Sequence, residues 1–251
     1  MRSTTFGMGS SNIYDSYLSP LEYKGLELRI SSERMHMTHL LKDNVSRQSF
    51  FNINFSRTEN VSGSGIMYYG MFSWSYALHY QFHVAKGLKL LAGPFIDLNA
   101  GFIFNRRNSN NPAQGKAYGS IGASGMAIYK FHIKRYPMVA RYQLDLPLVG
   151  LAFSPEYGQS YYEIFNVGHS NSVVHFTSLH NSPSMRHTLT FDFPIRKAVL
   201  RIGYMADIRQ FKLSGLRSHA YSNNFMIGYV RNIYRLKGKN KVSMPEKYTP
   251  F

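Results

Sequence analysis

Hydrophobic and polar residues alternate along much of the chain, and the stretch from Ile66 to Val84 shows this pattern best. Its even positions are large and mostly aromatic, whereas the odd positions from Ser73 to His83 are small or polar. A helix would instead repeat its apolar positions every three or four residues. Strands of soluble proteins average about five or six residues, and a tilted strand in lipid needs roughly nine to eleven. The pattern therefore predicts a long strand with two different faces.

The same alternation recurs in other segments of the chain. These segments are 26–30, 51–55, 88–104, 120–133, 138–148, 186–193 and 200–209. A large soluble β-sandwich or a lipocalin-like barrel also alternates. Three features argue against this alternative, namely the length of the strands, the aromatic residues on the apolar faces and the many charges on the opposite faces. A membrane barrel, with lipid outside and a polar interior, explains all three.

The connections between these segments differ in length. Short turns are expected at 85–87, 134–135 and 194–197, and long loops at 105–115 and 154–172. Short turns on one side and longer loops on the other are typical of outer-membrane barrels. We therefore predict an all-β, antiparallel transmembrane barrel over residues 1–235. It has about ten strands if 154–185 is mostly one long outer loop, and twelve are possible if that segment adds a hairpin.

Composition supports this prediction. Aromatic residues make up 15% of the chain, as expected if they form girdles at the two membrane interfaces. Cysteine is absent, which excludes disulfides, thiol nucleophiles and cysteine-based metal sites. No window of about 18 apolar residues is free of charge, so a transmembrane helix is excluded. The chain shows no signal peptide after Met1, although export requires one, so we expect a mature region or a misplaced start.

The net charge of +16 is compatible with nucleic acid, an anionic membrane surface or a basic channel lining. Basic residues crowd the end of the chain, and residues 236–251 are interpreted as a solvated basic tail. A nucleic-acid partner is not expected, because no binding module is recognisable. The expected partners are outer-membrane lipid and lipopolysaccharide, together with an envelope protein that the sequence does not identify.

Charged residues on the polar faces form the main candidate site. They either line a pore, bind a substrate or pair with one another. Pairing is favoured, because a barrel of about ten strands is close to the size that side chains fill. The predicted lumen network consists of Asp97, Arg141, Asp145, Asp192, Arg201, Asp207 and Arg209, with Arg186 on the same face.

A second candidate is catalytic. The run Gly168-His169-Ser170-Asn171 resembles the His-x-Ser-Asn pattern of outer-membrane phospholipase A and lipid A deacylase. On a strand, however, adjacent residues point to opposite faces, so His169 does not readily accept the proton of Ser170. His180 and Ser182 have the required spacing, but Pro183 follows in place of Asn. No metal or cofactor site is predicted.

Most of the chain, from about Ser3 to Tyr234, resembles an uncharacterised family of barrel proteins from the outer membranes of anaerobic Gram-negative bacteria, a domain of unknown function. The resemblance rests on four stretches. They are SNIYDSYLSPLEYKG (11–25), LLAGPFIDLNAGFIFNRRNSNNPAQGKAY (90–118), GASGMAIYKFHI (122–133) and FSPEYGQSYYEIF (153–165). The resemblance implies an outer-membrane barrel and assigns no activity.

Together these observations predict a non-enzymatic barrel in the outer membrane of a Gram-negative bacterium. Its lumen is expected to be packed with charged side chains, and its role to be structural or to bind an envelope partner. A lipid hydrolase of the phospholipase or lipid A deacylase type is the alternative.

Overall fold

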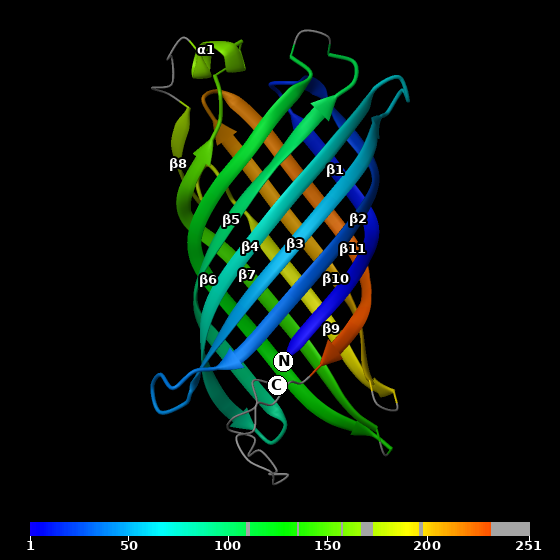
Figure 1. Ribbon diagram of the computed structural model, residues 1–251, viewed down its shortest axis with the longest axis vertical. Helices are drawn as coiled ribbons and strands as arrows, with labels where there is room; N and C mark the ends of the chain where they lie inside the picture. Colours follow the sequence, from blue (N-terminus) through cyan, green and yellow to red (C-terminus); the bar gives the residue numbers. More distant parts are fainter. Residues whose placement is uncertain (109–110, 135, 157, 167–172, 196–197, 232–251) are drawn as a thin grey trace.

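A computed structural model of the chain contains one antiparallel sheet that closes on itself (Figure 1). It describes residues 1–108, 111–134, 136–156, 158–166, 173–195 and 198–231, so the predicted tail and His169 lie outside the described residues. No helix among these residues is long and apolar enough to cross a membrane. The strands of the wall are β1 (Arg2–Asp15), β2 (Ser19–Met37), β3 (Val45–Asn60), β4 (Ile66–Ala85), β5 (Leu88–Asn105), β6 (Ala113–Ile133), β7 (Tyr136–Phe153), β9 (Met185–Ile195), β10 (Ala198–Leu213) and β11 (Leu216–Arg231).

Neighbouring strands of the wall follow one another along the chain, and pairing of β1 with β11 closes the barrel. Two short elements, α1 (Tyr161–Phe165) and β8 (Val174–Ser178), lie between β7 and β9. Strand β8 pairs with β7 over 149–153, while β7 and β9 pair directly over 139–145. The predicted closed antiparallel barrel of ten strands is therefore confirmed. The described residues of the segment 154–184 add one short strand and not the full hairpin of a twelve-strand wall.

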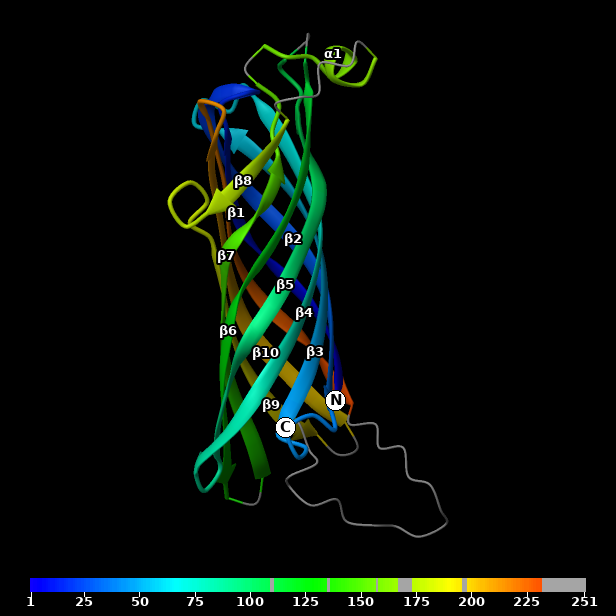
Figure 2. The same ribbon diagram turned by 90° about the vertical axis from the view of Figure 1, so that its left-hand side faces the viewer.

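The two ends of the barrel differ. We call the end with Met1 and Arg231 the terminal end, and the end with α1 the loop end (Figures 1 and 2). The short turn 86–87 and the ends of β6 and β9 that lead into the other two predicted short turns lie at the terminal end, whereas the ends of β5 and β7 that lead into the two predicted long loops lie at the loop end. Short and long connections are not fully sorted between the two ends. The seven-residue loop 38–44 also lies at the terminal end, and the two-residue turn 214–215 lies at the loop end. Residues 41–43 of the former have positive φ although none is glycine, so no turn signal marked this loop.

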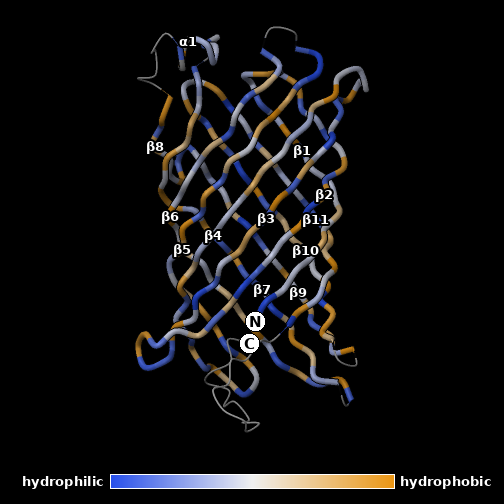
Figure 3. Tube along the Cα trace, viewed as in Figure 1, coloured by the Kyte–Doolittle hydropathy of each residue, from blue (hydrophilic) through white to orange (hydrophobic). Residues whose placement is uncertain are grey.

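The alternation seen in the sequence sorts side chains between the outside and the interior. Figure 3 shows orange and blue positions interspersed along the strands. In β3, Phe51, Ile53 and Phe55 are exposed, whereas Asn52 and Asn54 are buried in the interior. One irregularity shifts the pattern in β7: Gly122 pairs with Pro147 and Ile121 with Val149. This bulge lets two successive residues face outward, after which the parity of β7 is reversed.

The outer surface carries an apolar band with charged limits. On β2 the exposed residues Leu26, Leu28 and Ile30 lie between Lys24 and Arg34. On β3 the exposed apolar residues lie between positions 47 and 57, both arginine. Ten residues at about 3.3 Å each, tilted by about 40°, give a height of roughly 25 Å. This is the height of the apolar band of a transmembrane barrel.

Apolar clusters fill the interior at both ends. The cluster at the loop end consists of Ile13, Tyr17, Leu18, Tyr23, Met67, Tyr69, Met71, Ile103 and Leu216. The cluster at the terminal end consists of Met1, Met35, Leu91, Met126, Ile128 and Val230. Methionine is common in both, and its flexible side chain fills irregular gaps. The polar part of the interior therefore lies between two apolar plugs.

Candidate functional site

Charged side chains from five strands meet in the middle of the interior. Strand periodicity explains this, because every second residue of a strand points to the same face. The buried carboxylates are Glu27 and Glu33 of β2, Asp97 of β5, Asp145 of β7, Asp192 of β9 and Asp207 of β10. The buried guanidinium groups are Arg29 of β2, Arg141 of β7, Arg186 of β9, and Arg201 and Arg209 of β10.

The longer chain of ion pairs begins at Asp145. Its Oδ2 lies 2.7 Å from Nη2 of Arg186, whose Nη1 lies 3.8 Å from Oδ1 of Asp97. Arg209 joins two carboxylates, with Nη1 at 2.8 Å from Asp97 and Nε at 2.8 Å from Asp207. Arg186 and Arg209 each contact two carboxylates, and this pairing ties β5, β7, β9 and β10 together.

The chain then continues to β2. Nη1 of Arg29 lies 3.6 Å from Asp207, and Nη2 of Arg29 lies 2.8 Å from Glu27. Glu27 is fully buried and accepts hydrogen bonds from four neutral side chains besides Arg29. These donors are Asn54 at 3.2 Å, Ser56 at 3.0 Å, Ser222 at 2.5 Å and Asn224 at 2.7 Å. This carboxylate therefore has the hydrogen-bond partners that a buried charge requires.

A second, shorter chain of ion pairs centres on Glu33. Its two oxygens accept hydrogen bonds from Nη1 and Nη2 of Arg141 at 2.5 and 2.8 Å. Nη1 of Arg201 lies 2.8 Å from Oε2 of Glu33, and Nε of Arg201 lies 2.7 Å from Oδ1 of Asp192. Such two-pronged contacts fix the planes of both groups as well as their separation.

Two glutamines connect the two chains. Gln48 donates to Glu33 at 2.6 Å and to Gln143 at 2.9 Å. Gln143 in turn donates to Asp145 at 2.9 Å. Together the two ion-pair chains and this amide bridge form one continuous structure, which we call the interior network.

The interior is electrically balanced. Among the described side chains, seven carboxylates and six cations are buried, the latter including Lys89. Lys116, which is largely buried, lies 2.5 Å from the buried carboxylate of Asp15 and supplies the seventh cation. The net charge of +16 therefore belongs to the outside, the rims and the tail, not to a channel lining.

All seven residues predicted for the lumen network lie in the interior network, as does Arg186. The sequence prediction missed Glu27, Arg29 and Glu33. A signal was present, because Glu27 and Arg29 lie on the polar face opposite Leu26 and Leu28. Glu33 also has an odd number on this strand, so extending the alternation past Ser31 places it on the same polar face.

The side chain of His180 forms its hydrogen bond with a serine other than Ser182, the residue that has the spacing of the hydrolase pattern. Nδ1 of His180 instead contacts Oγ of Ser178 in a short hydrogen bond. The spacing argument assumed a strand, but residues 179–181 form a turn in which that periodicity does not apply. Ser182 is buried, and its backbone N–H donates to the carbonyl oxygen of Ser178 at 2.7 Å.

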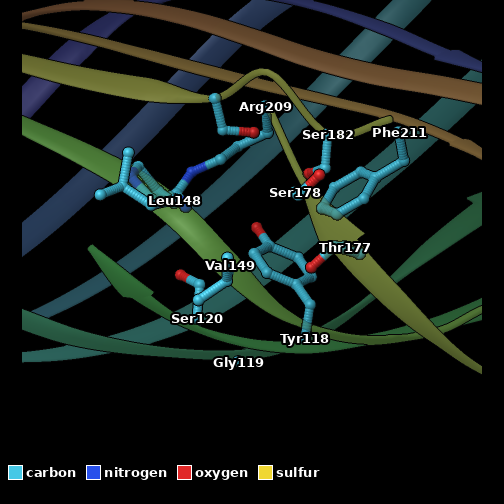
Figure 4. Close-up of a pocket in the computed structure, with 12 residues that line it drawn as sticks. Tyr118, Gly119, Ser120, Leu148, Val149, Thr177, Ser178, Ser182, Arg209 and Phe211 are labelled. Carbon is cyan, nitrogen blue, oxygen red and sulfur yellow. The ribbon is translucent and has the colours of Figure 1, made fainter. Parts of the chain in front are cut away.

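The strand pairing of the barrel wall changes near this turn. Beyond the pair Asp145–Arg186, β7 leaves β9 and pairs with β8, so the edge of β10 is covered by the segment 179–184. The backbone N–H of Lys212 donates to the carbonyl oxygen of Asn181 at 2.8 Å. A cavity of about 20 Å³ remains here, with Tyr118, Val149 and Thr177 around it (Figure 4). It has room for about one water molecule, so little space remains where the strand pairing changes.

No group of three or more metal-binding side chains occurs within the described part of the chain. The buried carboxylates of the interior network are engaged by guanidinium, amide and hydroxyl groups. The arrangement is that of a closed, self-neutralised core.

Two solved outer-membrane proteins are similar to the chain, and the first of them shows the same fold. The outer membrane protease OmpT from Escherichia coli is similar with a TM-score of 0.50 and 6% identity, over 91% of this chain and 94% of that one. The transport unit of the autotransporter AIDA-I from Escherichia coli gives a TM-score of 0.44 and 8% identity, over 92% and 90% of the two chains. The fold is thus that of an outer-membrane β-barrel.

Among curated proteins, none matches the chain. A family model matches almost its whole length, residues 1–240, and is described as a protein of unknown function, DUF3316. The predicted resemblance to an uncharacterised family of outer-membrane barrels is therefore confirmed. The chain belongs to the DUF3316 family.

Proposed function

We propose that this protein is a sealed, non-enzymatic barrel in the outer membrane of a Gram-negative bacterium, where it serves as a structural or binding component of the envelope. The proposal places the terminal end in the periplasm and the loop end outside the cell. The observation that carries it is the filled interior, in which a balanced ion-pair network lies between two apolar plugs.

A filled interior favours rigidity over transport. A solute or ion crossing the barrel would have to displace both apolar clusters and separate buried ion pairs such as Arg201–Asp192. Breaking one such pair costs about 3–5 kcal/mol, because it leaves an uncompensated buried charge. The surfaces left for function are then the outer face, the two rims and the long connection 154–184.

Conductance in a planar lipid bilayer tests the sealed state. Protein refolded in detergent, with folding verified by different migration of boiled and unboiled samples, is added to the bilayer under an applied voltage. The proposal predicts no stepwise conductance. Reproducible steps that scale with salt concentration would show an open lumen and refute it.

One observation supports a lipid hydrolase as the second candidate. Ser178 and His180 are in contact at the loop end, where outer-leaflet lipid is within reach, and a histidine can activate a serine hydroxyl. Release of fatty acid from phospholipid and lipopolysaccharide distinguishes the two functions. Activity that is lost in Ser178→Ala and kept in the matched variant Ser182→Ala would establish the hydrolase, whereas no release by folded protein would eliminate it for these substrates.

A further inference from the structure

Three arginines face one another on the outside of the terminal end. Arg2 is the direct cross-strand partner of both Arg34 and Arg231, and all three side chains are exposed. We call these three residues the arginine collar. Like charges directly opposite one another in a sheet are destabilising. None of the three forms an ion pair with a carboxylate in the described parts of the chain.

The loop end is built differently. Two of its exposed cations next to the apolar band have a carboxylate two positions away on the same strand. Lys24 lies 3.6 Å from Glu22, and Arg57 lies 2.7 Å from Glu59. These two charges are compensated within the protein, whereas no carboxylate of the described residues pairs with the collar.

An apolar groove lies next to the collar on the same face. It has a volume of about 540 Å³, and its lining includes Phe6, Met8, Leu28, Ile30, Phe225 and Ile227. These residues belong to β1, β2 and β11, the three strands that carry the collar. Phe225 is 76% exposed, an unusually high value for a large side chain within a strand. The groove therefore presents apolar surface to the lipid hydrocarbon.

The spacing of groove and collar is the same on each strand. Phe6 lies four positions from Arg2 along its strand, and the same offset holds for Ile30 and Arg34 and for Ile227 and Arg231. Four residues correspond to about 13 Å along a strand, and to roughly 10 Å along the axis of a tilted barrel. Comparable distances separate the phosphate of a glycerophospholipid from the upper part of its acyl chains.

We infer that the collar and the groove form one binding site for an anionic glycerophospholipid in the leaflet at the terminal end. The guanidinium groups bind the phosphodiester, because their paired N–H donors match its oxygens. An acyl chain occupies the groove. The bound phosphate supplies the counter-charge that the described residues do not provide, and the lipid joins β11, β1 and β2 where the first and last strands close the barrel. The inference depends on the membrane location proposed above, but not on a sealed lumen.

Native mass spectrometry of the folded protein in detergent tests this site. Phosphatidylglycerol is compared with phosphatidylcholine, and glycerol 3-phosphate serves as a competitor without acyl chains. Retention of one phosphatidylglycerol is expected, with a preference over phosphatidylcholine of about tenfold. Equal retention of the two lipids, or displacement of the lipid by equimolar glycerol 3-phosphate, would overturn the composite site.

Variants separate the two halves of the site. The triple variant Arg2→Gln, Arg34→Gln, Arg231→Gln should weaken retention on the order of a hundredfold, because each cation near a lipid surface contributes about 1 kcal/mol. The loss of two exposed cations at the loop end, Lys24→Gln with Arg57→Gln, should leave retention unchanged. Unchanged retention in the collar variant would refute the inference.

A second variant keeps the test valid if the collar variant does not refold. Ile30→Trp fills the groove from its lipid-facing side and leaves every charge in place. It should weaken retention of phosphatidylglycerol several-fold, and wild-type retention would exclude the groove as the acyl site. Absence of conductance steps in the same preparations would show that the sealed barrel stands whatever the lipid result.

Discussion

Glu33 is the residue whose removal best tests the interior network. It accepts hydrogen bonds from Arg141 at 2.5 and 2.8 Å, from Arg201 at 2.8 Å, from Gln48 at 2.6 Å and from Ser3 at 3.3 Å. Glu33→Gln keeps the shape of the side chain but removes its charge and turns one acceptor into a donor. The guanidinium groups of Arg141 and Arg201, each at most 4% exposed, then lose this negative charge, while Arg201 keeps its ion pair with Asp192.

The expected loss of stability is large. Removing one partner of a buried ion pair costs about 3–5 kcal/mol, and the unfavourable contact between an amide N–H and a guanidinium adds to it. The free energy of unfolding is measured in detergent or lipid vesicles by urea titration, with folded and unfolded protein resolved by their electrophoretic migration. The exposed ion pair between Glu22 and Lys24 offers a matched control. Glu22→Gln removes a carboxylate whose side chain is 48% exposed and should cost less than about 1 kcal/mol.

A double variant identifies the cause of that loss. If uncompensated charge is responsible, adding Arg141→Gln to Glu33→Gln restores the balance and should recover about 1–2 kcal/mol. A loss below about 1 kcal/mol in Glu33→Gln, or a double variant less stable than the single one, would refute the reasoning.

The remaining predictions concern backbone contact, the lipid face and the terminal plug. Gly228→Ala should prevent or strongly slow folding in vesicles, because its Cβ would lie 2.0 Å from the Thr4 carbonyl oxygen, whereas Gly125→Ala, with open space around its Cβ, should fold normally. Ile53→Arg, in the middle of the apolar band, should lower the free energy of unfolding by about 2–4 kcal/mol in vesicles, and a value near zero would contradict the assigned band. Leu91→Ala should cost about 2–5 kcal/mol in urea titration, and a loss below about 1 kcal/mol would contradict a packed plug.

Alternation made much of this fold predictable from the sequence. The strand at 66–84 and the polar faces carrying Asp97 and Arg209 follow from a period of two, which the barrel enforces because lipid and interior lie on opposite sides of every strand. The loop 38–44 was not predictable, because its left-handed residues are Leu41, Lys42 and Asp43 and carry no glycine signal.

Two features depend on contacts that no local pattern encodes. The apolar plugs occupy inward positions that the alternation rule assigns to polar residues, as with Met67 and Leu91. Only the barrel geometry shows that these residues gather at the two ends. The contact between Ser178 and His180 likewise depends on a turn where the strand period no longer applies.

The central claim is a closed barrel with lipid outside and a dry, filled interior. Because the chain lacks cysteine, single cysteines placed at successive positions 47–57 of β3 can be probed in vesicles with water-soluble and lipid-soluble maleimides. The structure predicts that the lipid-soluble reagent modifies positions 51, 53 and 55, and that neither reagent modifies 52 and 54. Modification of 52 and 54 by the water-soluble reagent would reveal an aqueous lumen, and its reaction at 53 would contradict the membrane location.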